Sequence, residues 1–337
     1  MKVLISDYAE LIEETSHKER QHLLEIHPDW EVEIYPYSNN PEELVDKMNQ
    51  SDALMTAFLP LDEEILNKMY TIKCISINAT GYNTVDIAAA TKKGIAVMAI
   101  DEYCTVEVAE HTMSLILALG RGLKKYIKEL EVNQRWHYST AGRLRRLRGQ
   151  KIGIFGFGRI GRQVAELAKG FGMEVYAYQD GVHGSDGAME AEEVHFTGLD
   201  EICSQCSVIT NHMSQNAENH HFFNWQFFSK LEQNPVFINV GRGDAVQEDD
   251  LLRALNENIL SGAALDVQAE ENPDLENNPF LKRDNVIITP HAAFYSEESI
   301  EALVRISTDN IVHYMDRSFE KVKRIINPQV IKEEEEK

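Results

Sequence analysis

The stretch Lys151-Ile152-Gly153-Ile154-Phe155-Gly156-Phe157-Gly158-Arg159-Ile160-Gly161 joins an apolar strand to a G-x-G-x-x-G turn and the start of a helix. Glycines in such a turn leave room for a pyrophosphate, and the following helix points its backbone N–H groups and positive dipole end at it. The helical spacing of apolar residues up to Phe171, and the strand pattern of 174–178, add to the motif. The stretch therefore favours a dinucleotide-binding turn over a glycine-rich turn in an ordinary α/β domain.

The turn begins only after 150 of the 337 residues, so another folding unit precedes it. Strand-like runs alternate with charged helical segments on both sides of the turn, which is typical of parallel sheets. The sequence predicts two doubly wound α/β domains, with chain crossings near residues 102 and 293. The expected strands are 3–6, 32–35, 53–56, 74–77 and 95–97 before the turn, and 174–178, 194–197, 208–211, 236–239, 262–266 and 286–289 after it.

Two helices are expected outside this alternation. Residues 104–130 form one long segment that is apolar on nearly every side, which predicts a helix buried between domains or against another subunit. Residues 296–315 predict a second helix, with Ser296 as its N-cap and apolar residues along one side. This second helix is expected to return to the first domain.

Composition narrows the class of protein. The chain has 33 basic and 55 acidic residues, and the resulting formal charge of −22 argues against nucleic-acid binding. No apolar run reaches the length of about 18 residues that a membrane helix needs, and the first seven residues turn polar too early for a signal peptide. We therefore expect a cytoplasmic protein without a membrane partner.

The four cysteines are too few for a disulfide framework and fit a reducing compartment. Cys203 and Cys206 form a C-x-x-C pair, but no second pair is present to complete a zinc site. We expect both to pack where a helix ends and a strand begins, and we expect no metal site.

Three polar residues follow predicted strands, at the sheet edge where open α/β sheets bind ligands. Arg242 follows 236–239, Glu271 follows 262–266 and His291 follows 286–289. Taken singly, each has a structural alternative: a turn arginine, a loop glutamate or a histidine at a strand end. On three successive strands of one sheet, the three together indicate a catalytic site.

With these blocks in place, the chain resembles the D-isomer-specific 2-hydroxyacid dehydrogenase family over nearly its whole length. Residues 78–86 are similar to the family's substrate-carboxylate loop, and residues 108–121 to its interdomain and dimer helix. The segments 239–243, 266–271 and 289–291 resemble those that carry its catalytic arginine, glutamate and histidine. The pair Phe294-Tyr295 is similar to the D-lactate dehydrogenase and C-terminal-binding-protein branches.

The resemblance implies a flavodoxin-like substrate domain of residues 1–102 and 293–337, a Rossmann domain of residues 103–292, and a cleft between them. It implies hydride transfer between NAD and the C2 carbon of a small 2-oxo acid or D-2-hydroxy acid. His291 would act as general acid and base, because the neighbouring carboxylate of Glu271 favours its charged form. Arg242 would clamp the substrate carboxylate.

The other contacts are implied in the same way. The substrate site would comprise Ala79, Thr80, Gly81, Arg242, His291 and Tyr295. The cofactor site would comprise Gly156, Gly158, Arg159, Ile160, Gly161, Gln179, Asp180, His212, Val240, Gly241, Arg242, Asp266 and His291. Within this site, His212 would approach the adenosine side of the cofactor and Asp266 would reach the nicotinamide amide. For His212, capping of a loop is an equal alternative. The helical region 105–130 would form a homodimer.

The sequence departs from the family pattern where an acidic residue should bind the ribose hydroxyls. Gln179 stands at that position and Asp180 follows it, with no Arg or Lys from 179 to 189 to neutralise a 2′-phosphate. NAD is therefore the favoured cofactor, and NADP stays open as an alternative. Two alternative functions stay open: a regulatory, co-repressor-like protein that senses NAD(H), and a hydroxypyruvate or glyoxylate reductase that prefers NADPH.

Overall fold

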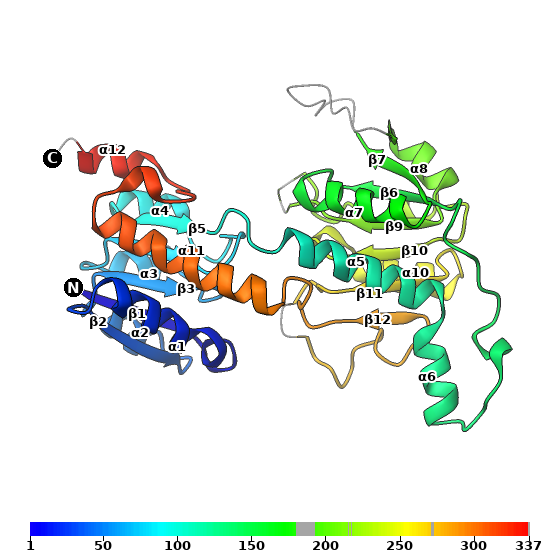
Figure 1. Cartoon of the computed structure of the whole chain (residues 1–337), viewed down its shortest axis with the longest axis horizontal. Helices are drawn as coiled ribbons and strands as arrows, with labels where there is room; N and C mark the ends of the chain where they lie inside the picture. The colour runs from blue at the N-terminus through cyan, green and yellow to red at the C-terminus, as the bar shows by residue number, and fades with distance from the viewer. Residues whose placement is uncertain (180–192, 215, 217, 271–272, 336–337) are drawn as a thin grey trace. The chain divides into compact units, whose positions relative to one another are not determined.

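The computed structural model describes residues 1–179, 193–214, 216, 218–270 and 273–335. The chain divides into two compact units, which are coloured along the chain in Figure 1. Unit 1 comprises Met1–Tyr103 and Ser296–Lys337, and unit 2 comprises Cys104–Tyr295. The two crossings therefore lie at residues 103/104 and 295/296.

Unit 1 is built on a five-stranded parallel sheet in the order β2-β1-β3-β4-β5. The strands lie where the alternation predicts them. They are β1 (Lys2–Tyr8), β2 (Glu31–Tyr37), β3 (Ala53–Thr56), β4 (Cys74–Ile77) and β5 (Ala96–Ala99). In register, Val3 of β1 lies opposite Val32 of β2 on one side and Ala53 of β3 on the other.

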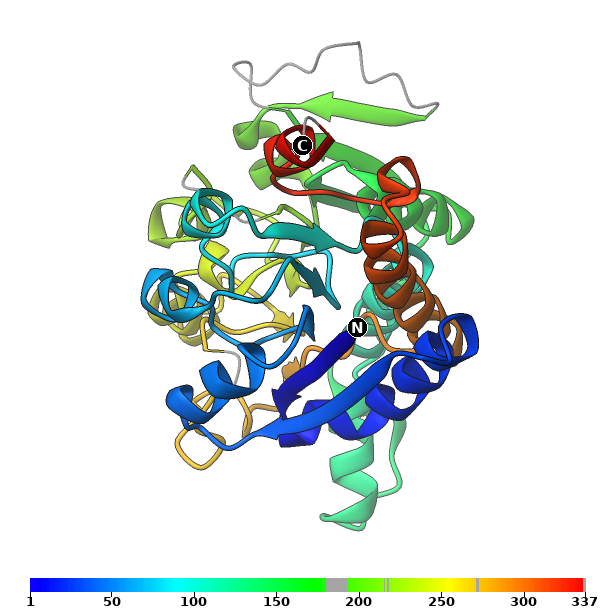
Figure 2. The ribbon, with the colours of Figure 1, turned by 90° about the vertical axis from the view of Figure 1, so that its left-hand side faces the viewer.

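Helices cover both faces of this sheet (Figure 2). One face carries α1 (Ala9–Ile26) and α11 (Glu297–Met315), and the other carries α2 (Pro41–Met48), α3 (Glu63–Lys68) and α4 (Ile87–Lys92). Successive strand residues point to opposite faces, so Leu4 and Leu54 join the core under α2 to α4, while Val3 and Ala53 join the core under α1 and α11. Burial on both faces explains why the strands read as continuous apolar runs.

The outer edge of β5 is covered by a segment from the end of the chain. Met98 forms an antiparallel bridge with Ile325. Val97 accepts a 2.8 Å hydrogen bond from the N–H of Ile326, and Ala99 donates a 3.0 Å bond to Arg324. Between α11 and this segment lies the short η3 (Phe319–Lys321), and α12 (Gln329–Glu335) follows it. The edge strand is therefore paired rather than open.

The helix expected over 296–315 is confirmed as α11, and Ser296 is its N-cap. The Ser296 side chain accepts from the N–H of Ser299, and the Ser299 side chain accepts from the N–H of Ser296. This reciprocal capping box satisfies two N–H groups that the first helical turn leaves without intrahelical partners.

Unit 2 contains a seven-stranded parallel sheet in the order β12-β11-β10-β9-β6-β7-β8. The strands are β6 (Lys151–Phe155), β7 (Glu174–Tyr178), β8 (Val194–Thr197), β9 (Val208–Asn211), β10 (Val236–Asn239), β11 (Gly262–Leu265) and β12 (Val286–Ile288). One face packs on α5 (Thr105–Gly120) and α7 (Arg159–Gly170), and the other on α8 (Leu199–Gln205), α9 (Trp225–Phe228) and α10 (Glu248–Asn256). The strand order reverses between β6 and β9, which is where doubly wound sheets bind ligands.

The expectation of one continuous helix over 104–130 is wrong. The segment is two helices, α5 and α6 (Leu123–Glu131), separated at Gly122, whose φ is 62°. A Cβ at Gly122 would lie 2.9 Å from the Cβ of Ala141, so the break is fixed by a later segment as well as by the backbone. α5 contributes Val108 and Ile116 to the core, whereas α6 has no buried residue and extends away from the sheet (Figure 1).

Cys203 and Cys206 pack at the junction of α8 and β9, as expected. Both are buried free thiols, and burial raises the pKa of Cys203 to about 11 and that of Cys206 to about 12. Neither thiol is therefore ionised near neutral pH, which removes its reactivity. Among the described residues, His, Cys, Asp and Glu form no group of three or more suited to a metal ion. Within the same residues, no helix is both long and apolar enough to cross a bilayer.

Candidate functional site

The glycine turn lies at the point where the strand order of unit 2 reverses. The N–H of His212, just after β9, donates a 2.7 Å hydrogen bond to the carbonyl of Phe155 at the end of β6. Gly156 then takes a φ of 89°, and a Cβ there would lie 2.6 Å from the carbonyl carbon of His212. Only glycine fits this position, because both the backbone angle and the close neighbour exclude a side chain.

The other two glycines of the motif have different surroundings. A Cβ at Gly161 would overlap the carbonyl oxygen of Gly156, whereas a Cβ at Gly158 would meet nothing within 4 Å. Gly161 therefore allows α7 to pack against the turn, and Gly158 leaves open space in front of the helix. Arg159 and Ile160 are the first residues of α7, and Gly158, as N-cap, has no side chain to cap their turn. The backbone of this turn fits a pyrophosphate.

His212 is uncharged at neutral pH. Burial lowers its pKa to about 3, its Nε2 lies 3.0 Å from the Oγ1 of Thr210, and its buried Nδ1 has no partner among the described residues. The sequence leaves a choice between an adenosine contact and a loop cap. The ring bonds within β9, and its cofactor role stays a prediction.

The position expected to face the ribose is only partly described. Gln179 follows β7, is exposed, and donates its N–H to the carbonyl of Thr197 at 2.9 Å. Asp180 lies outside the described residues. The preference between NAD and NADP therefore stays a prediction.

Two buried asparagines shape the loop that carries Arg242. The Asn211 amide donates a 2.9 Å bond to the Oδ1 of Asn239, which also accepts from the N–H of Gly241 at 3.1 Å. The Nδ2 of Asn239 donates to the carbonyl of Arg242 at 3.0 Å. Val240 is buried beside this network, and the half-buried Arg242 donates from Nη1 to the carbonyl of Gly241 at 2.8 Å. The asparagine side chains replace the missing strand partners and fix the backbone from which the guanidinium projects.

The carboxylate of Asp266 organises the segment after β12. It is 2% exposed and accepts hydrogen bonds from the Thr289 hydroxyl at 2.5 Å, the Ala292 N–H at 2.9 Å and the Ala293 N–H at 3.0 Å. The Nε2 of His111 on α5 lies 3.1 Å from the Thr289 hydroxyl and 3.6 Å from the Asp266 carboxylate. The described contacts of Asp266 therefore hold residues 289–293, and its expected contact with the nicotinamide stays a prediction.

His291 is held in an uncommon backbone conformation. Its φ is 50°, in the left-handed region that few residues other than glycine adopt, and its N–H donates to the carbonyl of Asp266 at 2.8 Å. Its ring lies 6.3 Å from that of Phe294, centroid to centroid. Tyr295, expected in the substrate pocket, is 54% exposed. Strain of this kind concentrates at functional sites.

A chain of backbone bonds brings two of the three expected catalytic residues to one edge of the sheet. The N–H of Asp266 donates to the carbonyl of Asn239 at 2.9 Å, and the N–H of His291 donates to Asp266. The loop of Arg242 follows β10 and the segment of His291 follows β12, and the two are joined through Asp266 at the end of β11, the strand between them. Glu271, the third residue, lies outside the described residues.

In unit 1, the segment expected to bind the substrate carboxylate follows β4. The carbonyl of Ala79 accepts from the N–H of Ile100 at 3.1 Å, and the carbonyl of Thr80 accepts from the Nη1 of Arg324 at 2.9 Å. Both carbonyls are therefore occupied by neighbouring backbone and side-chain donors. Gly81 ends the segment and is half-buried.

Three residues that organise the site were not assigned such a role from the sequence. They are His111, Asn211 and Thr289, whose partners lie far along the chain. One of them had a readable signal, because Asn211, like Asn239, ends an apolar strand where a buried amide needs partners. His111 had none, since its partner Thr289 is 178 residues away.

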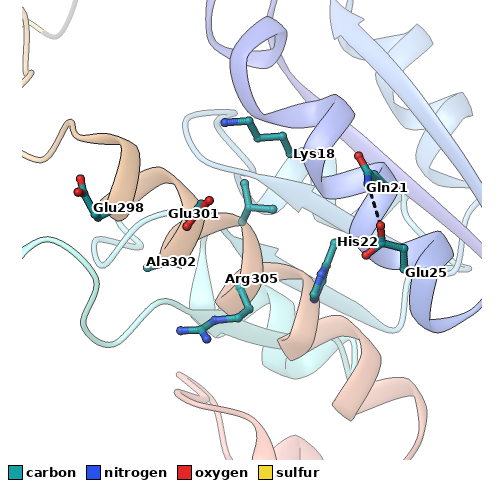
Figure 3. A pocket seen from close by; sticks show the side chains of 9 residues that line it. Lys18, Gln21, His22, Glu25, Glu298, Glu301, Ala302 and Arg305 are labelled. Carbon is teal, nitrogen blue, oxygen red and sulfur yellow. Dashed lines mark hydrogen bonds between the residues drawn. The ribbon is translucent and has the colours of Figure 1, made fainter.

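Two hollows in the described part of the chain lie away from these residues. A groove of about 440 Å³ runs between α1 and α11 of unit 1, lined by charged side chains of both helices (Figure 3). A second hollow of about 560 Å³ in unit 2 is lined by α5, residues 141–147 and the amino ends of the strands. Neither includes a residue of the glycine turn, of 78–81, or of 289–293.

Comparisons with a family model and with individual known proteins indicate the same family. Residues 113–293 match the model of the D-isomer specific 2-hydroxyacid dehydrogenase NAD binding domain. A hydroxypyruvate reductase of Blautia hydrogenotrophica is 32% identical over 282 residues, which cover 82% of this chain and 86% of that protein. A D-lactate dehydrogenase of Lactiplantibacillus plantarum is 31% identical over 268 residues, which cover 75% of this chain and 79% of that protein.

A solved structure agrees with these relatives. The D-lactate dehydrogenase of Aquifex aeolicus, complexed with NAD and lactic acid, superposes with a TM-score of 0.83 at 27% identity, covering 96% of this chain and 99% of that one. The match extends over both units and is not confined to the Rossmann sheet. Together with the glycine turn and the edge that carries Arg242 and His291, it shows that the chain belongs to the D-isomer specific 2-hydroxyacid dehydrogenase family and is an NAD(P)-dependent oxidoreductase.

Proposed function

We propose that this protein interconverts a small 2-oxo acid and its D-2-hydroxy acid. The observation that carries the proposal is the bonded series Asn239, Asp266 and His291, which joins the arginine loop to the histidine segment at the carboxyl edge of the sheet. The same edge carries the glycine turn that fits a pyrophosphate. When bound, the reduced nicotinamide supplies the hydride that adds to C2 of the 2-oxo acid.

The residues of the chain then have distinct roles. The Arg242 guanidinium pairs with the substrate carboxylate through two parallel hydrogen bonds, and the backbone of residues 79–81 binds the same carboxylate. The His291 imidazolium donates its proton to the carbonyl oxygen as that oxygen becomes a hydroxyl, and it accepts the proton in the reverse reaction. Glu271 favours the charged imidazole, and Tyr295 lines the side-chain pocket.

Hydroxypyruvate and glyoxylate are the second candidate substrates. The specific support is that relatives at 32% and 27% identity are a hydroxypyruvate reductase and a glyoxylate reductase. We propose NAD as cofactor because residues 179–189 contain no Arg or Lys that would neutralise the 2′-phosphate of NADP. The alternative function, a regulatory protein that senses NAD(H), would use the same fold to bind the cofactor but would not turn over a 2-oxo acid.

One assay separates these functions. NADH and NADPH oxidation is measured with pyruvate, hydroxypyruvate, glyoxylate and longer 2-oxo acids, and NADH binding is measured by fluorescence. Turnover with NADH on one of these acids is expected. Tight NADH binding without turnover on any acid would support the sensor, and turnover that requires NADPH would contradict the proposed cofactor.

We propose that the protein forms a homodimer through the α5–α6 region. Six large apolar residues within 16 positions are exposed, namely Leu123, Ile127, Leu130, Val132, Trp136 and Tyr138. α6 has one charged side and one apolar side, and covering the apolar side removes exposed apolar surface from water. A second copy provides a self-complementary cover.

A further inference from the structure

A buried glutamate lies behind the segment that the proposed function assigns to the substrate carboxylate. Glu19, on α1, is 0% exposed, and its Oε1 accepts a 2.6 Å hydrogen bond from the Nδ2 of Asn78. Asn78 is the first residue after β4 and leads directly into residues 79–81. Its own N–H donates to the carbonyl of Thr56 at the end of β3, at 2.8 Å.

The glutamate and the asparagine each have an atom that the bond between them does not use. The Oε2 of Glu19 and the Oδ1 of Asn78 are both buried, and neither has a hydrogen-bond partner among the described residues. An ionised Glu19 has only hydrogen-bond acceptors, so it offers no donor to the Oδ1 of Asn78. A proton on Oε2 adds a donor to the two groups and removes a buried negative charge.

We infer that Glu19 is a positioning residue whose neutral carboxyl group holds the Asn78 amide and thereby fixes the backbone of residues 79–81. The inference rests on the proposed function, in which these residues bind the substrate carboxylate. Glu19 itself does not touch the substrate. Its effect should therefore fall on substrate binding rather than on hydride transfer.

The surroundings of Glu19 favour the neutral form. Burial raises its pKa to about 7, hydrogen bonds with Thr15 and Asn78 oppose the shift, and the carboxylate of Asp7 on β1 adds to it. Asp7 is buried and accepts from the Thr56 hydroxyl and the N–H groups of Ala57 and Phe58.

The other charged groups near α1 lie in the groove of Figure 3 or at the strand starts. On α11, Asp309 pairs with His22 at 3.0 Å, while Glu298, Glu301 and Arg305 line the groove with Lys18 and Glu25. On β2, Glu33 pairs with Lys2 at 2.7 Å and with Lys47 at 2.5 Å. None of these groups acts on Glu19 as Asp7 does.

Two variants with a matched control test the inference. Glu19→Gln keeps the size and the neutral pattern at every pH, since its amide both accepts and donates. Glu19→Ala removes the bond to Asn78. Glu25→Gln makes the same exchange at an exposed position of the same helix, where Glu25 accepts from Gln21. KM and kcat for the best 2-oxo acid, and the Kd of NADH, are measured at about pH 6 and about pH 8.5.

The expected signature is in KM. The ratio of wild-type KM to Glu19→Gln KM should be near one at about pH 6 and rise by about 3- to 30-fold at about pH 8.5, because few molecules keep the proton there. Glu19→Ala should have a raised KM at both pH values, with the Kd of NADH unchanged. Any pH effect on the chemical step that the two proteins share cancels in the ratio. A ratio that does not change with pH, or a normal KM for Glu19→Ala, overturns the inference.

Hydrogen exchange tests the role of Glu19 independently of the proposed function. If no 2-oxo acid is turned over, the proposed function fails, while exchange of a peptide covering residues 78–82 still reports on Glu19. Relative to Glu19→Gln, the wild-type peptide should exchange faster above about pH 7, after correction for intrinsic rates. Equal exchange in the two proteins at both pH values overturns the role of Glu19 even if turnover is present.

Discussion

The backbone N–H of His291 donates a 2.8 Å hydrogen bond to the carbonyl oxygen of Asp266, while the Asp266 side chain accepts from three groups of the segment that carries the histidine. One residue at the end of β11 thus fixes both the start and the end of the loop after β12. Because His291 also has a φ of 50°, its position depends on this anchor.

Asp266→Asn should therefore weaken both stability and catalysis. An amide directs a donor at one of the N–H groups or at the Thr289 hydroxyl, and a buried donor without a partner costs about 1–3 kcal/mol in the free energy of unfolding. Urea unfolding measures this loss. We expect kcat/KM for the 2-oxo acid to fall at least about tenfold. Asp200→Asn, an exposed partner of Lys230, serves as control; equal effects in the two variants would contradict the anchoring role.

His291→Asn separates the chemistry of the imidazole from the fold. Asparagine tolerates the left-handed backbone better than most residues, so the free energy of unfolding should change little. Turnover should be lost, because no group at position 291 then donates the proton, whereas the Kd of NADH should stay close to that of the wild type. Single-turnover reduction at the wild-type rate would remove His291 from the proposed role.

Substitutions in the glycine turn should separate fold from cofactor binding. Gly161→Ala places a Cβ on the carbonyl oxygen of Gly156 and should destabilise the protein by about 1–3 kcal/mol. Gly158→Ala meets nothing within 4 Å, so its cost without cofactor should be about 1 kcal/mol or less, while NADH affinity falls because the methyl group occupies the open space. Gly170→Ala, at the other end of α7, also meets nothing within 4 Å. This control should leave the NADH affinity unchanged, and it should change the free energy of unfolding by about 1 kcal/mol or less.

Glu19 should make stability depend on pH. Burial raises its pKa from 4.5 to about 7 in the folded protein, so the folded state retains a proton that the unfolded state loses. The loss in the free energy of unfolding that charged Glu19 causes is absent below about pH 4. It grows between about pH 4.5 and pH 7 and reaches about 3 kcal/mol above that range. Glu19→Gln should therefore unfold at a higher temperature than the wild type at about pH 8, and this advantage should shrink at about pH 5. A constant difference in Tm would contradict the shift.

The proposed dimer predicts a strong effect of a surface charge. Ile127 is 53% exposed in the single chain, and Ile127→Asp should change the stability of an isolated subunit by only about 0.5 kcal/mol. At a dimer interface the same change buries an unpaired charge, so we expect dissociation in analytical ultracentrifugation. Tyr70→Asp, at a residue of unit 1 that is 79% exposed, is the control. A monomeric wild type would contradict the proposal.

The fold could be predicted from the sequence wherever local patterns decide it. Apolar runs such as Val208–Asn211 gave the strands, and Ser296 identified the start of α11, because burial on both faces and helix capping are written in neighbouring residues. The break at Gly122 was missed, since apolar residues continue across it. The break is enforced by Ala141, which belongs to a later segment and lies close to Gly122.

The candidate site was likewise predictable only where local sequence patterns decide where its residues lie. The positions of Arg242 and His291 at one edge follow from the order of parallel strands, which the alternation predicts. The anchoring role of Asp266 and the burial of Glu19 did not follow, because their partners are separated by 23 and 59 residues. A glutamate in a charged helix gives no local sign that it faces the core. Glu271 and Asp180 stay predictions.

The pairing of β5 with residues 324–327 has a consequence for synthesis on the ribosome. Unit 2 is one continuous stretch, whereas the last sheet edge of unit 1 is covered only by a segment made more than 200 residues after β5. Until that segment emerges, the nascent chain carries an open strand next to a translated Rossmann sheet, and unpaired edges of this kind invite aggregation. Chaperone capture during translation should therefore be strongest between completion of β5 and release of residue 327.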